Sequence, residues 1–108
     1  MKEVHSREEL LASVEHGASI VLFSADWCRD CVFIKPFMPE VEEKFSAYQF
    51  LYADRDKLID VCQELDIFGI PSFIAYKDGK EIGRYVNKDR KTQEQIEAFI
   101  SDLSIKAD

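Results

Sequence analysis

Two cysteines separated by two residues, Cys28-Arg29-Asp30-Cys31, are the side chains in this sequence best suited to chemistry. Two thiols at this spacing can close a small disulfide ring, and the same spacing also occurs in zinc sites. The pair follows an apolar run, Ile20-Val21-Leu22-Phe23, and precedes a helical pattern, so we expect Cys28 at a helix N-terminus. Unpaired backbone N–H groups and the helix dipole favour a thiolate there. This placement indicates a redox centre.

Zinc is the main alternative, and the supply of further ligands argues against it. A structural zinc site takes four ligands. Cys62 falls on an apolar helical stripe, and His5 and His16 lie in or before the first expected helix, so no second ligand pair exists and we expect no metal. In the redox interpretation, Cys28 is an exposed nucleophile, and Cys31, one turn into the helix, resolves the mixed disulfide. A pair of inert cysteines at a helix end remains open.

Composition limits the class of protein. The 108 residues are enough for one domain, residues 1–108, and a hydrophobic content of 46% indicates an ordered core. A net charge of −7 argues against nucleic-acid binding, and no apolar run is long enough to cross a membrane. The odd cysteine count is not typical of a secreted disulfide framework, and the start of the chain shows no apolar signal core. We therefore expect a cytoplasmic protein.

Periodicity predicts four helices and four strands in the order α-β-α-β-α-β-β-α. The early strands are joined by helices and should be parallel, whereas Asp78-Gly79 marks a tight antiparallel hairpin. The expected fold class is therefore α/β, a central mixed sheet with helices on both faces. The strands are expected at 19–24, 48–53, 72–77 and 81–86, and the helices after Ser6, over about 28–45, around Leu58 to Leu65, and after Thr92.

Local signals refine these elements. Ser6 with Glu9 and Thr92 with Gln95 have the spacing of capping boxes. Pro36 should bend the second helix, and Asp54 or Asp56 can cap the third. A short basic run of Lys88, Arg90 and Lys91 is expected to be a solvated loop.

Four segments together give the chain a resemblance to the thioredoxin family over nearly its whole length. They are Ser24-Ala25-Asp26-Trp27-Cys28-Arg29-Asp30-Cys31, then Pro36, then Phe68-Gly69-Ile70-Pro71-Ser72-Phe73, and the Lys77-Asp78-Gly79-Lys80 hairpin. The resemblance implies a thioredoxin fold and a thiol–disulfide oxidoreductase that reduces disulfides in target proteins through Cys28 and Cys31. Electrons pass through the protein's own sulfurs, so no bound cofactor is implied.

The resemblance also implies further site residues and partners. Pro71 would have a cis peptide bond beside the sulfurs, although from sequence alone it could merely begin a strand. Ile70 would offer its backbone to an extended substrate segment, and Trp27 would form a wall of the substrate groove, with simple packing as its alternative. Thioredoxin reductase or a low-molecular-weight thiol would restore the dithiol, and we expect a monomer.

Several positions depart from the family pattern. Arg29 and Asp30 replace the usual Gly-Pro and could tune the thiolate in opposite directions. Leu22 and Tyr52 stand where a buried aspartate and its lysine partner are common, so we hypothesise that Asp26 or Asp30 moves the proton instead. Asn87 replaces a glycine beside the groove and could narrow or polarise it.

These departures leave two other functions open. One is a specialised redox sensor or a dedicated reductase with few targets, which the Arg29-Asp30 pair and Asn87 motivate. The other is a peptide-binding module with little turnover, although the presence of both cysteines speaks against it.

Overall fold

The computed structural model, described here over residues 1–103, contains one five-stranded sheet in the order β1-β3-β2-β4-β5. Strands β1, β3 and β2 run parallel to one another. On the other side of β2, strand β4 pairs antiparallel with β2, and β5 pairs antiparallel with β4. The predicted mixed sheet is confirmed. The strands are β1 (Lys2–Val4), β2 (Ala18–Ser24), β3 (Tyr48–Asp54), β4 (Ser72–Lys77) and β5 (Lys80–Tyr85).

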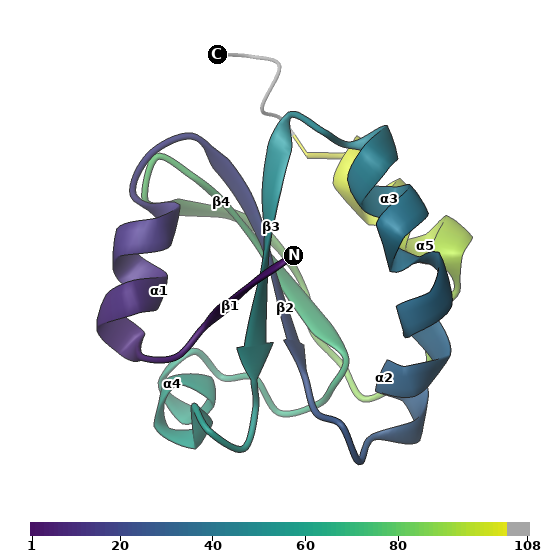
Figure 1. Ribbon diagram of the computed structural model, residues 1–108, viewed down its shortest axis with the longest axis horizontal. Coiled ribbons are helices and arrows are strands. Elements are labelled where there is room, and N and C mark those ends of the chain that lie inside the picture. Colours follow the sequence, from purple (N-terminus) through teal and green to yellow (C-terminus); the bar gives the residue numbers. More distant parts are fainter. Residues whose placement is uncertain (104–108) are drawn as a thin grey trace.

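Helices cover both faces of the sheet (Figure 1). One face is covered by α1 (Arg7–Val14) and α4 (Ile59–Glu64). The other is covered by α2 (Arg29–Ile34), the short 3-10 helix η1 (Lys35–Phe37), α3 (Met38–Lys44) and α5 (Gln93–Ser101). This arrangement confirms the predicted α/β architecture.

The continuous apolar run of β2 is explained by this double cover. Successive strand residues point to opposite faces, so Val21 and Phe23 pack under α1 and α4. Ile20 and Leu22 pack on the other face against α2 and α3. Since both faces are buried, the strand has no polar alternation, and it holds the following turn, with its two cysteines, in a fixed place.

Strand β1 was not predicted. Lys2, Glu3 and Val4 pair with Leu51, Tyr52 and Ala53 of β3. Such a short edge strand has no periodicity of its own and exists only because β3 offers a free edge.

The prediction of one continuous second helix over about residues 28–45 was wrong. It is divided into α2, η1 and α3, with Pro36 inside η1 and Pro39 at the start of α3. Each proline removes an N–H donor and obstructs the preceding turn, so two of them three residues apart interrupt the α-helical hydrogen bonds. The expected bend at Pro36 is therefore a full break.

The capping predictions had mixed outcomes. Thr92 and Gln95 form the complete capping box of α5. Ser6 accepts a hydrogen bond from the Glu9 backbone N–H, but the Glu9 carboxylate accepts from His5 rather than from Ser6. Neither predicted aspartate caps α4, whose N-cap residue is Leu58. The predicted Asp78-Gly79 hairpin is confirmed, with both residues at positive φ.

Candidate active site

The two cysteines meet at the start of α2, just beyond the end of β2. Cys28 is the N-cap residue, and its Sγ accepts a hydrogen bond of 3.2 Å from the backbone N–H of Cys31. Both thiols are free. The expected helix-terminal placement is confirmed.

The expected exposure of Cys28 was wrong. Only 7% of Cys28 and 4% of Cys31 are exposed, and both pack against Ala25 and the partly buried Ile70. Cys28 is covered by the loop that carries Ile70, which is distant from it in sequence. Sequence patterns around the cysteines therefore could not reveal their burial.

Burial is the main influence on the protonation of Cys31. Burial, followed by its hydrogen bond with Cys28, raises the pKa of Cys31 to about 11, while Ser24 acts in the opposite direction. Cys31 therefore holds its proton at neutral pH.

The loop opposite the cysteines carries a cis peptide bond between Ile70 and Pro71, as the resemblance implied. The Ile70 carbonyl oxygen lies 3.9 Å from Cys28 Sγ. Pro71 then leads directly into β4, which pairs with β2. Two paired strands thus bring the Ile70 carbonyl beside Cys28.

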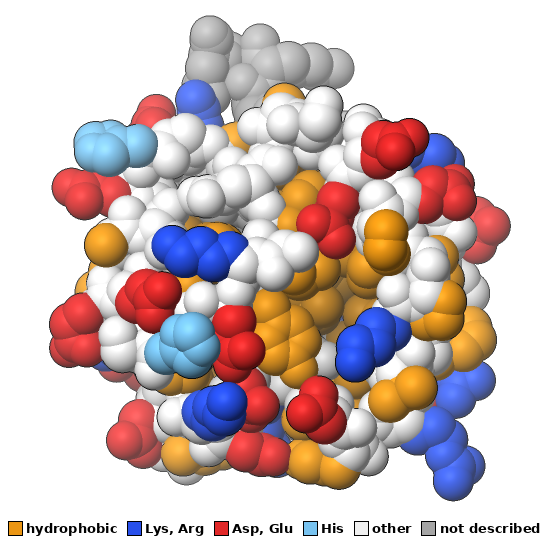
Figure 2. All heavy atoms as spheres, in the orientation of Figure 1, with side chains coloured by type: hydrophobic (Ala, Val, Ile, Leu, Met, Phe, Trp, Pro, Cys, Tyr) orange, Lys and Arg blue, Asp and Glu red, His pale blue; other side chains and the backbone are white. Residues whose placement is uncertain are grey.

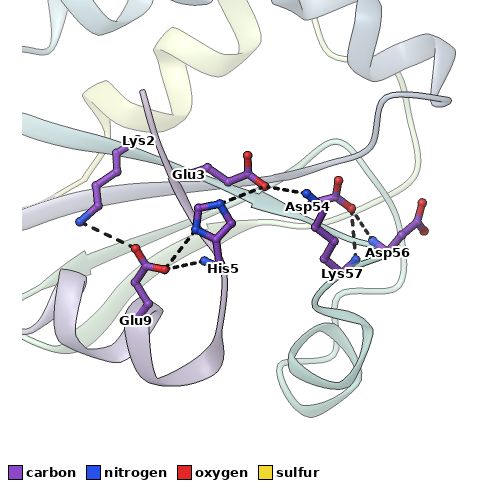
Figure 3. A network of polar contacts seen from close by, with 7 residues as sticks. All are labelled: Lys2, Glu3, His5, Glu9, Asp54, Asp56 and Lys57. Carbon is purple, nitrogen blue, oxygen red and sulfur yellow. Dashed lines mark hydrogen bonds and ion pairs between the residues drawn. The ribbon is translucent and has the colours of Figure 1, made fainter.

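Trp27 lies on the surface with 63% of its area exposed, so simple packing does not explain it. Its indole Nε1 donates to Asp56 at 2.5 Å. Asp56 is held in a turn where the Asp54 carboxylate accepts hydrogen bonds from the backbone N–H groups of Asp56 and Lys57 (Figure 3). Glu3 of β1 also pairs with Lys57, so the edge strand supports the turn that orients Trp27.

An apolar cavity of about 200 Å³ lies behind Cys31. Figure 2 shows it as a hollow of apolar side chains between the sheet and α2–α3. Leu22 and Tyr52 both line it. Its other walls include Ile34 and Met38, together with the charged side chains of Asp26, Lys35 and Glu42.

The two candidate proton carriers lie on different sides of the cysteine pair. Asp26 lines the cavity that Cys31 also lines. Asp30 is directed elsewhere, because its carboxylate is bound by Arg90 at 2.9 Å. Arg90 also lies over the Phe33 ring at 4.4 Å, and Arg29 is exposed. The structure brings Asp26, rather than Asp30, to the cavity that Cys31 lines.

The segment between β5 and α5 contains a residue that the sequence interpretation missed. Lys91, expected to be solvated, has no exposed surface. Its Nζ donates to Asn87 Oδ1 and to Asp89 O, each at 2.9 Å. The Asn87 amide oxygen is therefore engaged within its own loop, where it accepts hydrogen bonds from Lys91 and from the Asp89 backbone. No sequence pattern marks Lys91 as buried, because its acceptors come from the turn that it stabilises.

The remaining site predictions concern metals, membranes and the third cysteine. Within residues 1–103, no group of three or more His, Cys, Asp or Glu side chains could hold a metal ion. The same part of the chain contains no helix long and apolar enough to span a membrane. Cys62 is 1% exposed and packs in the α1–α4 core, which confirms its prediction as a packing residue.

Comparison with known proteins gives one consistent result. The Thioredoxin family model matches residues 2–102. Thioredoxin from Sus scrofa is 34% identical over 95% of this chain and 98% of its own length, and Thioredoxin H9 from Arabidopsis thaliana is 34% identical over 91% and 72%. The crystal structure of thioredoxin from Trypanosoma brucei brucei superposes with a TM-score of 0.83 at 21% identity, covering 98% of this chain and 90% of that one, and supports the fold.

The match of the family model over nearly the whole chain and the identity to full-length thioredoxins agree with a Cys-x-x-Cys pair placed at a helix N-terminus. The chain belongs to the thioredoxin family and is a thiol–disulfide oxidoreductase.

Proposed function

We propose that Cys28 is the nucleophile and Cys31 the resolving thiol of this oxidoreductase. The Cys28 thiolate attacks one sulfur of a target disulfide, forms a mixed disulfide and releases the other target sulfur as a thiolate. Cys31 then loses its proton and attacks Cys28 Sγ, which closes the Cys28–Cys31 disulfide and releases the reduced target. The observation that carries this assignment is the Cys31 N–H directed at Cys28 Sγ, 3.2 Å away.

Trp27, Ile70 and Pro71 form the proposed substrate groove. The cis peptide bond before Pro71 accompanies an Ile70 carbonyl beside Cys28, and an extended target segment can add to this backbone as a strand does. Trp27 is exposed and oriented by Asp56, which suits an aromatic wall. Phe68 is 76% exposed beside the same loop and adds apolar surface for a protein target.

Arg29 and Asp30 are proposed to tune the thiolate from within the motif. The Asp30 charge is partly offset by Arg90, so its opposition to a thiolate is weakened. This ion pair beside Phe33 supports the second candidate, a dedicated reductase or redox sensor with few targets, because it adds charge and shape that a target must match.

The dithiol is proposed to be restored by thioredoxin reductase or by a low-molecular-weight thiol, so that the protein transfers electrons and contributes to cell redox homeostasis. We propose a cytoplasmic monomer formed by a single domain. An odd cysteine count with one close pair supports a reducing compartment.

Steady-state reduction of a protein disulfide tests the assignment. Cys28→Ser and Cys31→Ser should each reduce turnover by on the order of 10³-fold or more, whereas Cys62→Ser should not, because Cys62 lies in the core on the other side of the sheet. Turnover near the wild-type rate in Cys28→Ser would refute the proposal. Biological activity that survives Cys28→Ser would instead favour a binding module without catalysis.

A further inference from the structure

Lys91 is a buried cation that the proposed reaction does not use. Its Nζ contacts three oxygens, Asn87 Oδ1 and Asp89 O at 2.9 Å and Asn87 O at 3.4 Å. An ammonium has three donors and no acceptor, so three oxygen acceptors match its charged form. The Tyr85 ring lies 5.0 Å from Nζ and adds a cation–π contact. These contacts hold a positive charge inside the protein.

The residues fixed by Lys91 contact the loop that carries Pro71. Ser72 Oγ lies 2.5 Å from Gly69 O and 3.3 Å from Asn87 O, so this hydroxyl joins the two segments. A Cβ at Gly69 would lie 2.6 Å from the Asn87 carbonyl carbon, which shows that the two backbones touch. Residues 87–91, called the 87–91 segment below, therefore support the backbone beside Ile70.

The same segment also contacts the loop that carries the cysteines. Arg90, the neighbour of Lys91, extends outward and binds Asp30 at 2.9 Å. Its guanidinium lies over Phe33 of α2. Consecutive side chains thus point in opposite directions, with Arg90 joined to the start of α2 and Lys91 locking the segment internally. The 87–91 segment therefore contacts both the start of α2 and the region of the Gly69–Pro71 loop, the two parts of the chain that adjoin Cys28.

We propose that Lys91 is a positioning residue for the dithiol: its buried ammonium locks the 87–91 segment against the Gly69–Pro71 loop and contributes a fixed positive charge to the electrostatic field at the two sulfurs. This inference rests on the proposed function of Cys28 and Cys31. The 87–91 segment then supplies a positive charge that Leu22 and Tyr52, which line the cavity beside Cys31, do not supply.

The electrostatic surroundings support this role. Burial lowers the pKa of Lys91, and Asp89, Cys31, Asp30 and Cys28 act to raise it, in that order of size. Asp89 belongs to the 87–91 segment and Asp30 to α2, and the Tyr85 ring of β5 covers Nζ. Because Coulomb interaction is mutual, an ammonium that a thiolate stabilises also stabilises that thiolate.

Substitution of Lys91 tests the proposal, with Lys88 of the same segment as the matched control because it is exposed. In Lys91→Met, iodoacetamide should alkylate Cys28 at pH 7 about five-fold more slowly, and KM for a peptide disulfide should rise. Lys91→Arg should restore much of the rate, and Lys88→Met should leave both values unchanged. A folded Lys91→Met protein with the wild-type alkylation rate and KM would overturn the proposal.

A second measurement uses the wild-type protein and does not depend on the folding of a variant. The Lys91 ammonium should titrate at higher pH in the dithiol form than in the disulfide form, as followed by nitrogen NMR of Nζ, because only the dithiol can become a thiolate. Equal midpoints would overturn the proposal. Loss of turnover in Cys28→Ser together with equal midpoints would reject only the role of Lys91 and keep the proposed function.

Discussion

The two sides of the cysteine pair differ in how they are built. On the inner side, Cys31 faces a cavity whose walls are mostly apolar and include Leu22 and Tyr52, with charged side chains such as Asp26 also among its lining residues. On the outer side, Asp30, Arg90 and Lys91 form ion pairs and hydrogen bonds around the 87–91 segment. The reaction needs both a thiolate that forms readily and a resolving thiol that stays protonated until it is used. A largely apolar side around Leu22 and a side rich in ion pairs can serve these two needs separately.

The variant with the largest expected effect places a charge among the apolar residues of the inner side. Leu22→Asp should lower the free energy of unfolding by about 3 kcal/mol, since it puts an unpaired carboxylate at a buried position. Such a carboxyl has a raised folded-state pKa, so the loss of stability should be small below its unfolded pKa of about 3.9 and grow as pH rises. Urea unfolding at pH 5 and pH 8 measures both effects.

Two further variants sharpen this test. Leu22→Asn, which has the same shape without the charge, should cost less and show no such pH dependence. Leu22→Asp with Tyr52→Lys should recover part of the stability, because Leu22 and Tyr52 are register partners in β2 and β3. A Leu22→Asp protein as stable as wild type at pH 8 would contradict an apolar inner side.

The raised pKa of Cys31 predicts a steep pH dependence of the resolving step. With a value of about 11, the thiolate fraction of Cys31 increases about ten-fold per pH unit between pH 7 and pH 9, or about 100-fold in total. A mixed disulfide of Cys28 with thionitrobenzoate, formed at low pH and transferred to higher pH, would report resolution through absorbance of the released thiol. A rate that is flat above pH 7 would show that the Cys31 proton does not limit this step.

The two aspartates beside the cysteines should differ in their effect on the same rate. Asp26→Asn should slow resolution by about five-fold, well below the effect of a fully placed general base, because Asp26 is itself exposed. Asp30→Asn should change it by less than two-fold, since Asp30 is bound to Arg90. The thionitrobenzoate release assay compares the two variants directly. Equal effects of Asp26→Asn and Asp30→Asn would contradict the proposed difference between the inner and outer sides of the cysteine pair.

The smallest effect is expected at Trp27. Asp56→Ala removes the acceptor of the indole N–H, which should raise KM about two-fold and change stability by less than about 1 kcal/mol, because the contact is exposed. The chain contains one tryptophan, so its fluorescence reports the change without interference. Unchanged fluorescence would mean that Asp56 does not orient the ring in solution.

Local pattern was sufficient for much of the fold and for the cysteine pair. The apolar run of β2 and the helical pattern after it were enough to place Cys28 at a helix N-terminus, and the Asp78-Gly79 turn fixed the hairpin. The cis bond at Pro71 followed from the family resemblance, because the sequence around one proline does not distinguish cis from trans.

What sequence could not supply depends on contacts between distant segments. Strand β1 exists because β3 has a free edge, and Cys28 is buried by a loop more than forty residues away. Lys91 was misjudged because a lysine in a charged run is normally solvated, and only the folded 87–91 segment provides the oxygens that bury it.

The central claim is that Cys28 attacks and Cys31 resolves, and mapping the mixed disulfide tests it most directly. A peptide disulfide is added to Cys31→Ser and to Cys28→Ser, and the adducts are located by mass spectrometry of proteolytic fragments. The account predicts rapid accumulation of an adduct on Cys28 in Cys31→Ser and little adduct in Cys28→Ser, whose remaining site thiol is buried, with burial as the main cause that raises its pKa. Equal or faster adduct formation on Cys31 in the Cys28→Ser protein would contradict it.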